Sequence, residues 1–371
     1  MTEASVPSPS AAAGPLAGLK VVEFAAIGPV PLAAMLLADM GADVICLTRP
    51  GTRVTDPRSI ITRGRRWIEL DLKDKDAAAG ALALMAGADM VLEGFRPGVM
   101  ERLGLGPEAA LAANPRLVFG RMTGWGQSGP LAPRAGHDIN YIAITGALDS
   151  IRGVDGAPVP PLNLVGDYGG GAMFLLAGVL AAVLNARATG QGQVVDAAMV
   201  DGTVSLLTLF HTRAALGAWG APGTNQLDGG CHYYGPFRCA DGRYLSVGPL
   251  EPQFYAEFRR IAGIDDPAFD AQDDRSQWPA LREKVAEVIA GRTRDEWTAL
   301  FDGSDACVAP VMGLGEAHAH PHLAARGTFV EKDGVRQAAP APRFSRTPGA
   351  ISPLPMGAPA TLADVLAAWK G

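Results

Sequence analysis

The sequence is short of positive charge: 32 lysines and arginines stand against 38 aspartates and glutamates, a formal net charge of −6. A nucleic-acid-binding protein needs a basic domain or stripe, so this balance argues against a nucleic-acid partner. Cysteine is also scarce, with Cys46, Cys231, Cys239 and Cys307 widely spaced and no CxxC pair. Disulfide scaffolds and zinc sites cluster their cysteines more closely, so we expect free thiols in a reducing compartment.

Long hydrophobic runs are missing as well. The longest apolar run, 172–184, is shorter than the roughly 18 residues that span a membrane, so it predicts a buried helix. Residues 1–15 are small, polar and interrupted by proline, without the basic start and apolar core of a signal peptide. They predict a disordered lead-in. Together these absences predict a cytoplasmic protein with no membrane partner.

Up to residue 122, short β-branched runs alternate with longer runs rich in alanine and leucine. LKVVEFA and ADVICLT are typical strands, and helix-then-strand patterns follow over 77–94 and 107–122. Strands separated by helices of roughly 10–15 residues predict parallel βαβ units, and therefore an α/β fold with its ligand at the carboxyl ends of the strands. The first strand–turn–helix, AAIGPVP, lacks GxGxxG, which argues against a redox dinucleotide.

The residue pattern changes after residue 224, from mainly helical to a strand hairpin followed by helices. YYGPFRCADGRYLSVGP predicts two strands around an Asp241–Gly242 turn, and helical patterns follow up to residue 301. We therefore divide the chain into a disordered lead-in (1–15), a Rossmann-like large domain (16–224), a smaller α+β domain (225–325) and a C-terminal return to the large domain (326–371).

Basic side chains gather in loops at one predicted edge of the sheet. Arg49 ends the second strand, where enzymes that use NAD place an acidic ribose ligand, and an arginine suits a phosphate instead. The others are Arg63, Arg65, Arg66, Lys73, Arg96 and Arg102. Any one of them can be an ordinary surface residue, but as a group they favour a ligand with several phosphates.

Two predicted helix starts contain proton-active side chains. His137 and Asp138 precede INYIAITGAL, and Asp167 precedes YGGGAMFLLAGVL. An aspartate at a helix start caps backbone N–H groups, which explains both aspartates without any catalysis. The three glycines 169–171 are poor helix formers, and close approach of a ligand would compensate for them. The N–H groups of such a helix start would then stabilise an anion.

Six stretches are long and distinctive: IELDLK, EGFRPGVMERLGLGP, RMTGWGQSGP, GHDINY, PPLNLVGDYGGG and GQVVDAAMVDG. Together they resemble the α-methylacyl-CoA racemases, a group within the family III CoA-transferases, and the resemblance runs from residue 16 to 344. It implies a homodimer of two interlocked chains. The active site of such a dimer lies between the large domain of one chain and the small domain of its partner.

The resemblance also implies roles for particular residues. His137 and Asp167 would be the acid/base groups on either side of the substrate α-carbon, and Asn163 and Glu251 would orient them, Glu251 from the neighbouring subunit. The CoA nucleotide would be held by Arg49, Leu70, Asp71, Leu72, Lys73, Gly94, Phe95, Arg96 and Arg102. The pantetheine–thioester end would be lined by Gly136, Asp138, Ile139, Asn140 and Tyr141.

The implied reaction interconverts (R)- and (S)-2-methyl-branched or 2-arylpropionyl acyl-CoA thioesters by 1,1-proton transfer through an enolate. One group removes the α-proton and the other returns a proton to the opposite face. Asp167 must be protonated in one half-cycle, so we expect its pKa to be raised. Amides at the Asp167 helix start would stabilise the enolate oxygen. CoA is part of the substrate, so no cofactor and no metal is expected.

Two alternatives to the racemase stay open. In the CoA transferases of the same family the equivalent aspartate is a nucleophile that forms mixed anhydrides, which would give Asp167 that role. That chemistry does not need a histidine at position 137, so His137 favours the racemase. The other alternative is a CoA-binding protein without catalytic activity.

One histidine cluster is a weaker candidate site. HAHPH contains His318, His320 and His322, and no acid or cysteine is arranged near them in the sequence. We therefore expect a loop or a helix end there and no metal site.

Overall fold

The computed structural model describes residues 14–52, 59–153, 156–352 and 359–370, so most of the predicted lead-in lies outside the described residues. The chain folds into two compact units. Unit 1 comprises Met1–Thr145, Pro161–Leu206 and Arg326–Gly371, and unit 2 comprises Gly146–Pro160 and Leu207–Ala325. The longer segment of unit 2 begins at Leu207, 18 residues before the predicted 225, and the shorter segment, Gly146–Pro160, lies within the predicted large domain.

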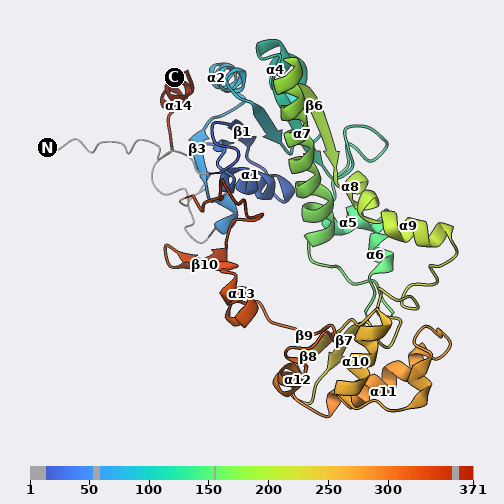
Figure 1. Ribbon diagram of the computed structural model, residues 1–371. Helices are drawn as coiled ribbons and strands as arrows, with labels where there is room; N and C mark the ends of the chain where they lie inside the picture. The colour runs from blue at the N-terminus through green and yellow to red at the C-terminus, as the bar shows by residue number, and fades with distance from the viewer. Residues whose placement is uncertain (1–13, 53–58, 154–155, 353–358, 371) are drawn as a thin grey trace. The chain divides into compact units, whose positions relative to one another are not determined.

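Unit 1 is built on a six-stranded sheet in which every neighbouring pair is parallel (Figure 1). Its strands are β1 (Lys20–Phe24), β2 (Asp43–Thr48), β3 (Arg65–Glu69), β4 (Met90–Glu93), β5 (Val118–Thr123) and β6 (Gln193–Ala198). Their order is β3-β2-β1-β4-β5-β6, the doubly wound order with its switch point between β1 and β4. The predicted α/β fold with a Rossmann-like sheet is therefore confirmed.

Helices cover both faces of this sheet. The helices of unit 1 are α1 (Pro29–Asp39), α2 (Lys75–Ala86), α3 (Val99–Arg102), α4 (Pro107–Ala113), α5 (Asp138–Ala143), the π-helix η2 (Leu164–Ala172), α7 (Met173–Thr189), α8 (Met199–Leu206) and α14 (Leu362–Lys370). A short 3-10 turn, η1 (Ile60–Thr62), precedes β3, and a hairpin of β10 (Phe329–Lys332) and β11 (Val335–Ala338) belongs to the C-terminal part.

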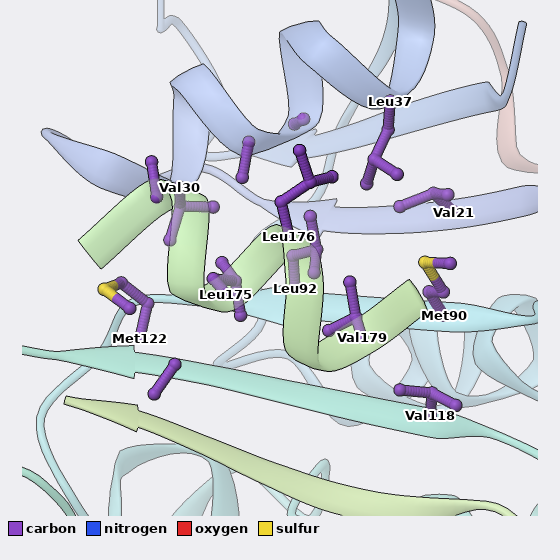
Figure 2. Packing of buried hydrophobic residues seen from close by; sticks show 14 of the residues in the cluster. Val21, Val30, Leu37, Met90, Leu92, Val118, Met122, Leu175, Leu176 and Val179 are labelled. Carbon is purple, nitrogen blue, oxygen red and sulfur yellow. The ribbon is translucent and has the colours of Figure 1, made fainter. Parts of the chain in front are cut away.

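The strand residues alternate between two cores. Val21 of β1 packs with Leu37 of α1 and Leu175 of α7, and this side of the sheet is shown in Figure 2. The next residue, Val22, points to the opposite side, where helices α2, α4 and α14 contribute to a second cluster. Because side chains of a strand alternate, two hydrophobic neighbours in β1 require helices on both faces.

The apolar run 172–184 is part of a longer helix than predicted. The π-helix η2 and α7 are continuous over Leu164–Thr189, 26 residues that are long and apolar enough to cross a membrane by length and composition. Half of the most apolar window is buried inside the protein, and α7 packs against β5 and β6. This packing against the sheet confirms the prediction of a buried core helix.

Unit 2 contains a three-stranded antiparallel sheet in the order β7-β8-β9. Strands β7 (Gly235–Arg238) and β8 (Tyr244–Val247) form the predicted hairpin, and the short strand β9 (Val308–Pro310) was not predicted. The helical elements are α6 (Ala147–Ser150), α9 (Thr208–Ala215), α10 (Pro252–Ala262), η3 (Pro267–Asp270), α11 (Trp278–Ala290), α12 (Arg294–Phe301), η4 (Ala317–Ala319) and α13 (Pro321–Ala325).

A fully buried histidine lies in the core of unit 2. His232 is 0% exposed, its Nε2 is 2.6 Å from the Tyr255 hydroxyl, and its ring packs edge-on against Tyr233 and Phe269. Burial, assisted by the positive charge of Arg259, lowers the pKa of His232 to about 4.

This histidine makes the stability of unit 2 depend on pH. The unfolded chain takes up a proton below a pH of about 6.5, whereas the folded protein stays neutral there down to about 4, so stability falls as the pH falls through that window. We expect a loss of about 2 kcal/mol between pH 7 and pH 5 from this group. Thermal unfolding of the wild type and His232→Gln at both pH values checks it; an equal pH dependence in the two proteins would contradict it.

Candidate functional site

A cavity of about 350 Å³ opens at the carboxyl ends of β1, β4, β5 and β6, beside the switch point of the sheet. The loops that follow these strands supply most of its wall, as the doubly wound fold predicts for a ligand site. Its lining residues are Ile27, Gly28, Pro29, Val30, Gly94, Phe95, Arg96, Pro97, Met122, Thr123, Gly124, Trp125, Ala132, Arg134, Ala135, Gly136, His137, Tyr141, Asp167 and Met199.

His137 lies in this wall at the start of α5. Its backbone is extended and directly precedes the first helical residue, and its N–H donates to the Asn140 side chain at 3.1 Å. Asn140 is the third residue of the helix and His137 is its N-cap. Their hydrogen bond therefore defines the direction in which the chain enters α5. The imidazole is thereby carried at a defined point of the cavity wall.

Asp167 lies in the same wall, in the first turn of a helix that begins three residues before it. The helix begins at Leu164, and the Tyr168 N–H donates to the Asn163 carbonyl at 3.2 Å, a five-residue step characteristic of a π-turn. The Asp167 N–H donates to Asp138 Oδ2 at 2.7 Å, so a carboxylate already occupies it. The helix therefore begins three residues earlier than predicted, and of the amides predicted to face an enolate oxygen, those of Asp167 and Tyr168 already have acceptors.

The surroundings of the Asp167 carboxyl favour its protonated form. Burial raises its pKa, and the negative charge of Asp138 raises it further. A hydrogen bond from Asn163 Nδ2 to Oδ2, at 3.2 Å, and the nearby His137 act in the opposite direction without reversing the shift. The pKa of Asp167 is thus raised, in the predicted direction, which favours the protonated form that acid/base chemistry at this carboxyl needs.

The loop after β1 comes close to this carboxyl. Gly28 has a φ of 73° and turns the chain into α1, and a Cβ at this position would lie 3.0 Å from Asp167 Oδ2. This is the single glycine of AAIGPVP, and its partner Asp167 lies 139 residues further along the chain, beyond the reach of a local pattern.

An aromatic pair forms another part of the wall. The rings of Trp125 and Tyr141 meet edge-to-face with centroids 4.8 Å apart, and the Tyr141 hydroxyl donates to the Gly136 carbonyl. A Cβ at Gly124 would lie 2.0 Å from the Tyr141 ring, so this glycine leaves the space in which the ring sits. Burial and the charge of Asp167 raise the pKa of Tyr141. Tyr141 is thus a neutral wall residue beside the carboxyl.

Two of the three consecutive glycines serve packing and not ligand approach, contrary to the prediction. Gly170 and Gly171 are buried in the contact between η2 and α8. A Cβ at Gly170 would lie 2.6 Å from the Thr203 hydroxyl, and one at Gly202 would lie 1.9 Å from the Gly170 carbonyl oxygen. The two helices therefore cross at almost backbone-to-backbone distance, which only glycines permit.

The predicted site residues separate into three groups. His137, Asp167, Gly94, Phe95, Arg96, Gly136 and Tyr141 line the cavity, and Asn163 and Asp138 contact Asp167 directly. Arg49, Leu70, Asp71, Leu72, Lys73, Arg102, Ile139 and Asn140 are not among the residues that line it. Glu251 belongs to unit 2, where it is exposed and precedes α10.

Three of the arginines predicted to bind phosphate form ion pairs with carboxylates of the same chain. Arg63 and Arg65 are buried, Arg63 against Asp39 and Arg65 against Glu23, each at 2.5 Å. Arg66 is exposed and pairs with Asp43 at 2.7 Å. The assignment of Arg63 and Arg65 to a phosphate site is therefore wrong, because a local sequence pattern does not reveal a buried acidic partner. A phosphate contact from the exposed Arg66 stays a prediction.

Several residues of the cavity wall were not predicted, among them a charged and an aromatic side chain. Arg134 and Trp125 lie in glycine-rich loops whose course no periodic pattern describes. His318, His320 and His322 lie in or at the ends of η4 and α13, as expected. Within the described ranges, no group of three His, Cys, Asp or Glu residues is arranged to hold a metal ion.

Comparison with known proteins identifies the family. Residues 16–360 match the profile of CoA-transferase family III, and the chain belongs to this family. It is 41% identical over 339 residues to the α-methylacyl-CoA racemase of Mus musculus, covering 91% of this chain and 88% of the relative. It is 42% identical over 336 residues to that of Homo sapiens, covering 90% and 87%. These similarities confirm the resemblance drawn from the motifs.

A solved structure supports the fold. The crystal structure of a CAIB/BAIF family protein from Brucella suis matches with a TM-score of 0.80 at 25% identity. The match covers 96% of this chain and 100% of that one.

Proposed function

We propose that this protein is an α-methylacyl-CoA racemase, which interconverts the (R) and (S) forms of 2-methyl-branched acyl-CoA thioesters. The observation that carries the proposal is the meeting of His137 and an Asp167 of raised pKa in the wall of one cavity at the switch point. The identity of 41–42% to two racemases, over about nine tenths of the chain, supports it. Such a substrate would place the protein in lipid metabolism.

The two side chains divide the chemistry between them. A proton α to a thioester carbonyl is weakly acidic, so it must be removed as the enolate oxygen is stabilised. In one direction His137 accepts the proton while a protonated Asp167 supplies one to the opposite face, and the reverse direction exchanges these roles. Burial raises the pKa of Asp167, which favours the protonated form that the donor role needs. Neither step requires a metal or a redox cofactor.

The enolate oxygen needs donors other than the Asp167 amide, which Asp138 occupies. The helix α5 begins directly after His137, a residue of the cavity wall, and its Asn140 and Tyr141 N–H groups donate to the His137 carbonyl. We assign this role to the two amides that precede them, those of Asp138 and Ile139. A preorganised amide of this kind lowers a barrier by roughly 3–4 kcal/mol.

The CoA part of the substrate would extend along the carboxyl edge of the sheet. Arg96 and Arg134 lie in the cavity itself, and either can pair with a phosphate. Arg49 follows β2 and Leu70–Lys73 follow β3, so both segments belong to the same edge of the parallel sheet, and we propose them, with Arg102, as nucleotide contacts.

The assembly we propose is an interlocked homodimer. In it Glu251 of one chain would orient His137 of the other, as the resemblance implies. Glu251 is exposed in the chain described here, which leaves its carboxylate free for such a contact.

Uptake of deuterium tests the function. A pure enantiomer of a 2-methyl-branched acyl-CoA, incubated with the protein in D2O, should gain one deuterium at the α-carbon and become racemic. No α-deuterium from a panel of branched thioesters would overturn the proposal. Transfer of CoA to an added carboxylic acid in the same mixture, retained in His137→Ala, would show a transferase instead.

A further inference from the structure

A second carboxylate is buried directly behind Asp167. Asp138 is 8% exposed and is not among the residues that line the cavity, although the resemblance implied that it would be. Its Oδ2 accepts the Asp167 N–H at 2.7 Å across 29 residues of sequence. Its Oδ1 is buried and accepts no hydrogen bond from the described residues. A buried carboxylate with one oxygen unpaired is costly, so a purpose beyond packing is expected.

The π-turn explains why the Asp167 amide needs an outside acceptor. In an α-helix this N–H would donate to the carbonyl of Asn163, four residues earlier. Here the Tyr168 N–H donates to the Asn163 carbonyl instead, because the π-turn contains one residue more than an α-helical turn. Asp138 replaces the missing acceptor and closes the turn from outside the helix.

The backbone around this contact leaves room for it. A Cβ at Gly166 would lie 2.5 Å from Asp138 Oδ2 and 3.0 Å from the side chain of Ile142. Only a glycine at 166 therefore lets the carboxylate reach the turn. The hydrogen bond, the wide turn and this glycine are three parts of one arrangement around the Asp167 backbone.

We propose that Asp138 is a positioning residue for Asp167: it holds the Asp167 N–H and thereby fixes the point of the cavity wall from which that carboxyl acts. This inference rests on the proposed racemase function for its kinetic consequences, but the contact itself does not. Misplacing a catalytic group by about 1 Å can cost about 100-fold in rate.

Asp138 has an electrostatic effect as well. Four side chains on the packed elements face the Asp167 carboxyl: His137, Asp138 and Tyr141 from α5 and its start, and Asn163 from the start of η2. Of these, Asp138 is the one whose charge raises the pKa of Asp167. Removing the charge without removing the acceptor should therefore shift the titration of Asp167 to lower pH.

Two substitutions separate the contact from the charge. Asp138→Asn keeps an oxygen that can accept the Asp167 N–H, and Asp138→Ala removes it. We expect Asp138→Ala to lower the rate of α-deuterium uptake about 100-fold with an unchanged KM for the thioester. Asp138→Asn should keep at least about a tenth of the rate, and the limb of its pH profile that reports Asp167 should move to lower pH.

A control and a readout without activity complete the test. Asp89→Ala is matched, because Asp89 is half-buried and accepts the Lys20 N–H at 2.9 Å, at the opposite edge of the sheet. Hydrogen exchange followed by mass spectrometry should show faster exchange over 164–172 in Asp138→Ala than in the wild type. In Asp138→Asn and in Asp89→Ala the exchange of this segment should be unchanged.

The outcomes distinguish this inference from the proposed function. A wild type without deuterium uptake overturns the racemase, while the exchange of 164–172 still tests the contact. If Asp138→Ala matches the wild type in rate and exchange, or loses activity only as Asp89→Ala does, the positioning role is wrong. If Asp138→Ala does not fold, the rate and pH profile of Asp138→Asn test the proposal instead. If the limb that reports Asp167 does not move in Asp138→Asn, the electrostatic effect is contradicted.

Discussion

Removing either proposed base should leave a protein that exchanges the α-proton of one enantiomer only. In His137→Ala the carboxyl of Asp167 remains on its side of the α-carbon, and in Asp167→Ala the imidazole remains on the other. Racemisation needs both groups, so it should fall about 1,000-fold in each variant, within the range that a positioned acid or base contributes. Exchange without inversion, however, needs only the base that faces the hydrogen.

The measurement is α-deuterium uptake from each pure enantiomer, with chiral analysis of the product. The two variants should prefer opposite enantiomers. His211→Ala is the control, because His211 is exposed on α9 in unit 2 and has no role in the proposal. If both variants exchange the same enantiomer, the two groups act on the same face and the proton-transfer scheme fails.

Much of the sheet could be predicted from sequence because its strands are apolar on both faces. Runs such as those of β1 and β2 need no knowledge of distant partners, and the alternation with helices specifies a parallel sheet. β3 was missed because two of its five residues are arginines. Arg65 is nevertheless buried, since Glu23 of the central strand β1 pairs with it. Such a partner, 42 residues away, is invisible to a local pattern.

The candidate site was predictable in its residue types and less so in its geometry. His137 and Asp167 stood out as a histidine and a carboxylate near glycine-rich helix openings. The π-turn could not be predicted, because its glycines look like a weak helix start. These glycines are needed because α8 packs closely against them, which a local pattern does not show. The contact from Asp138 to the Asp167 amide is a long-range hydrogen bond that no spacing rule predicts.

The buried pair of Arg63 and Asp39 should be among the largest single contributions to the stability of unit 1. Arg63 is 1% exposed; it donates twice to Asp39, to Gln337 Oε1 at 2.7 Å and to the Ala338 carbonyl at 2.9 Å. It thereby links the α1 helix to the C-terminal hairpin β10–β11. Arg63→Leu should lower the free energy of unfolding by about 3–5 kcal/mol, because it leaves the Asp39 carboxylate buried and unpaired.

The pH dependence gives this prediction its sign. Burial already raises the pKa of Asp39, and the guanidinium of Arg63 opposes that rise. Without Arg63 the folded protein holds the Asp39 proton more tightly than the unfolded chain, so stability is lost as the pH rises. The deficit of Arg63→Leu should therefore be larger at pH 7 than at pH 5, as urea unfolding at both values would show.

Two further variants identify the cause. Arg63→Leu combined with Asp39→Leu should recover part of the loss, since the unpaired charge is removed with its partner. Arg66→Leu breaks the exposed pair with Asp43, whose side chains are 45% and 40% exposed, and should cost no more than about 1 kcal/mol. A loss in Arg63→Leu no larger than in Arg66→Leu, or no recovery in the double variant, would mean that the buried charge is not what stabilises this junction.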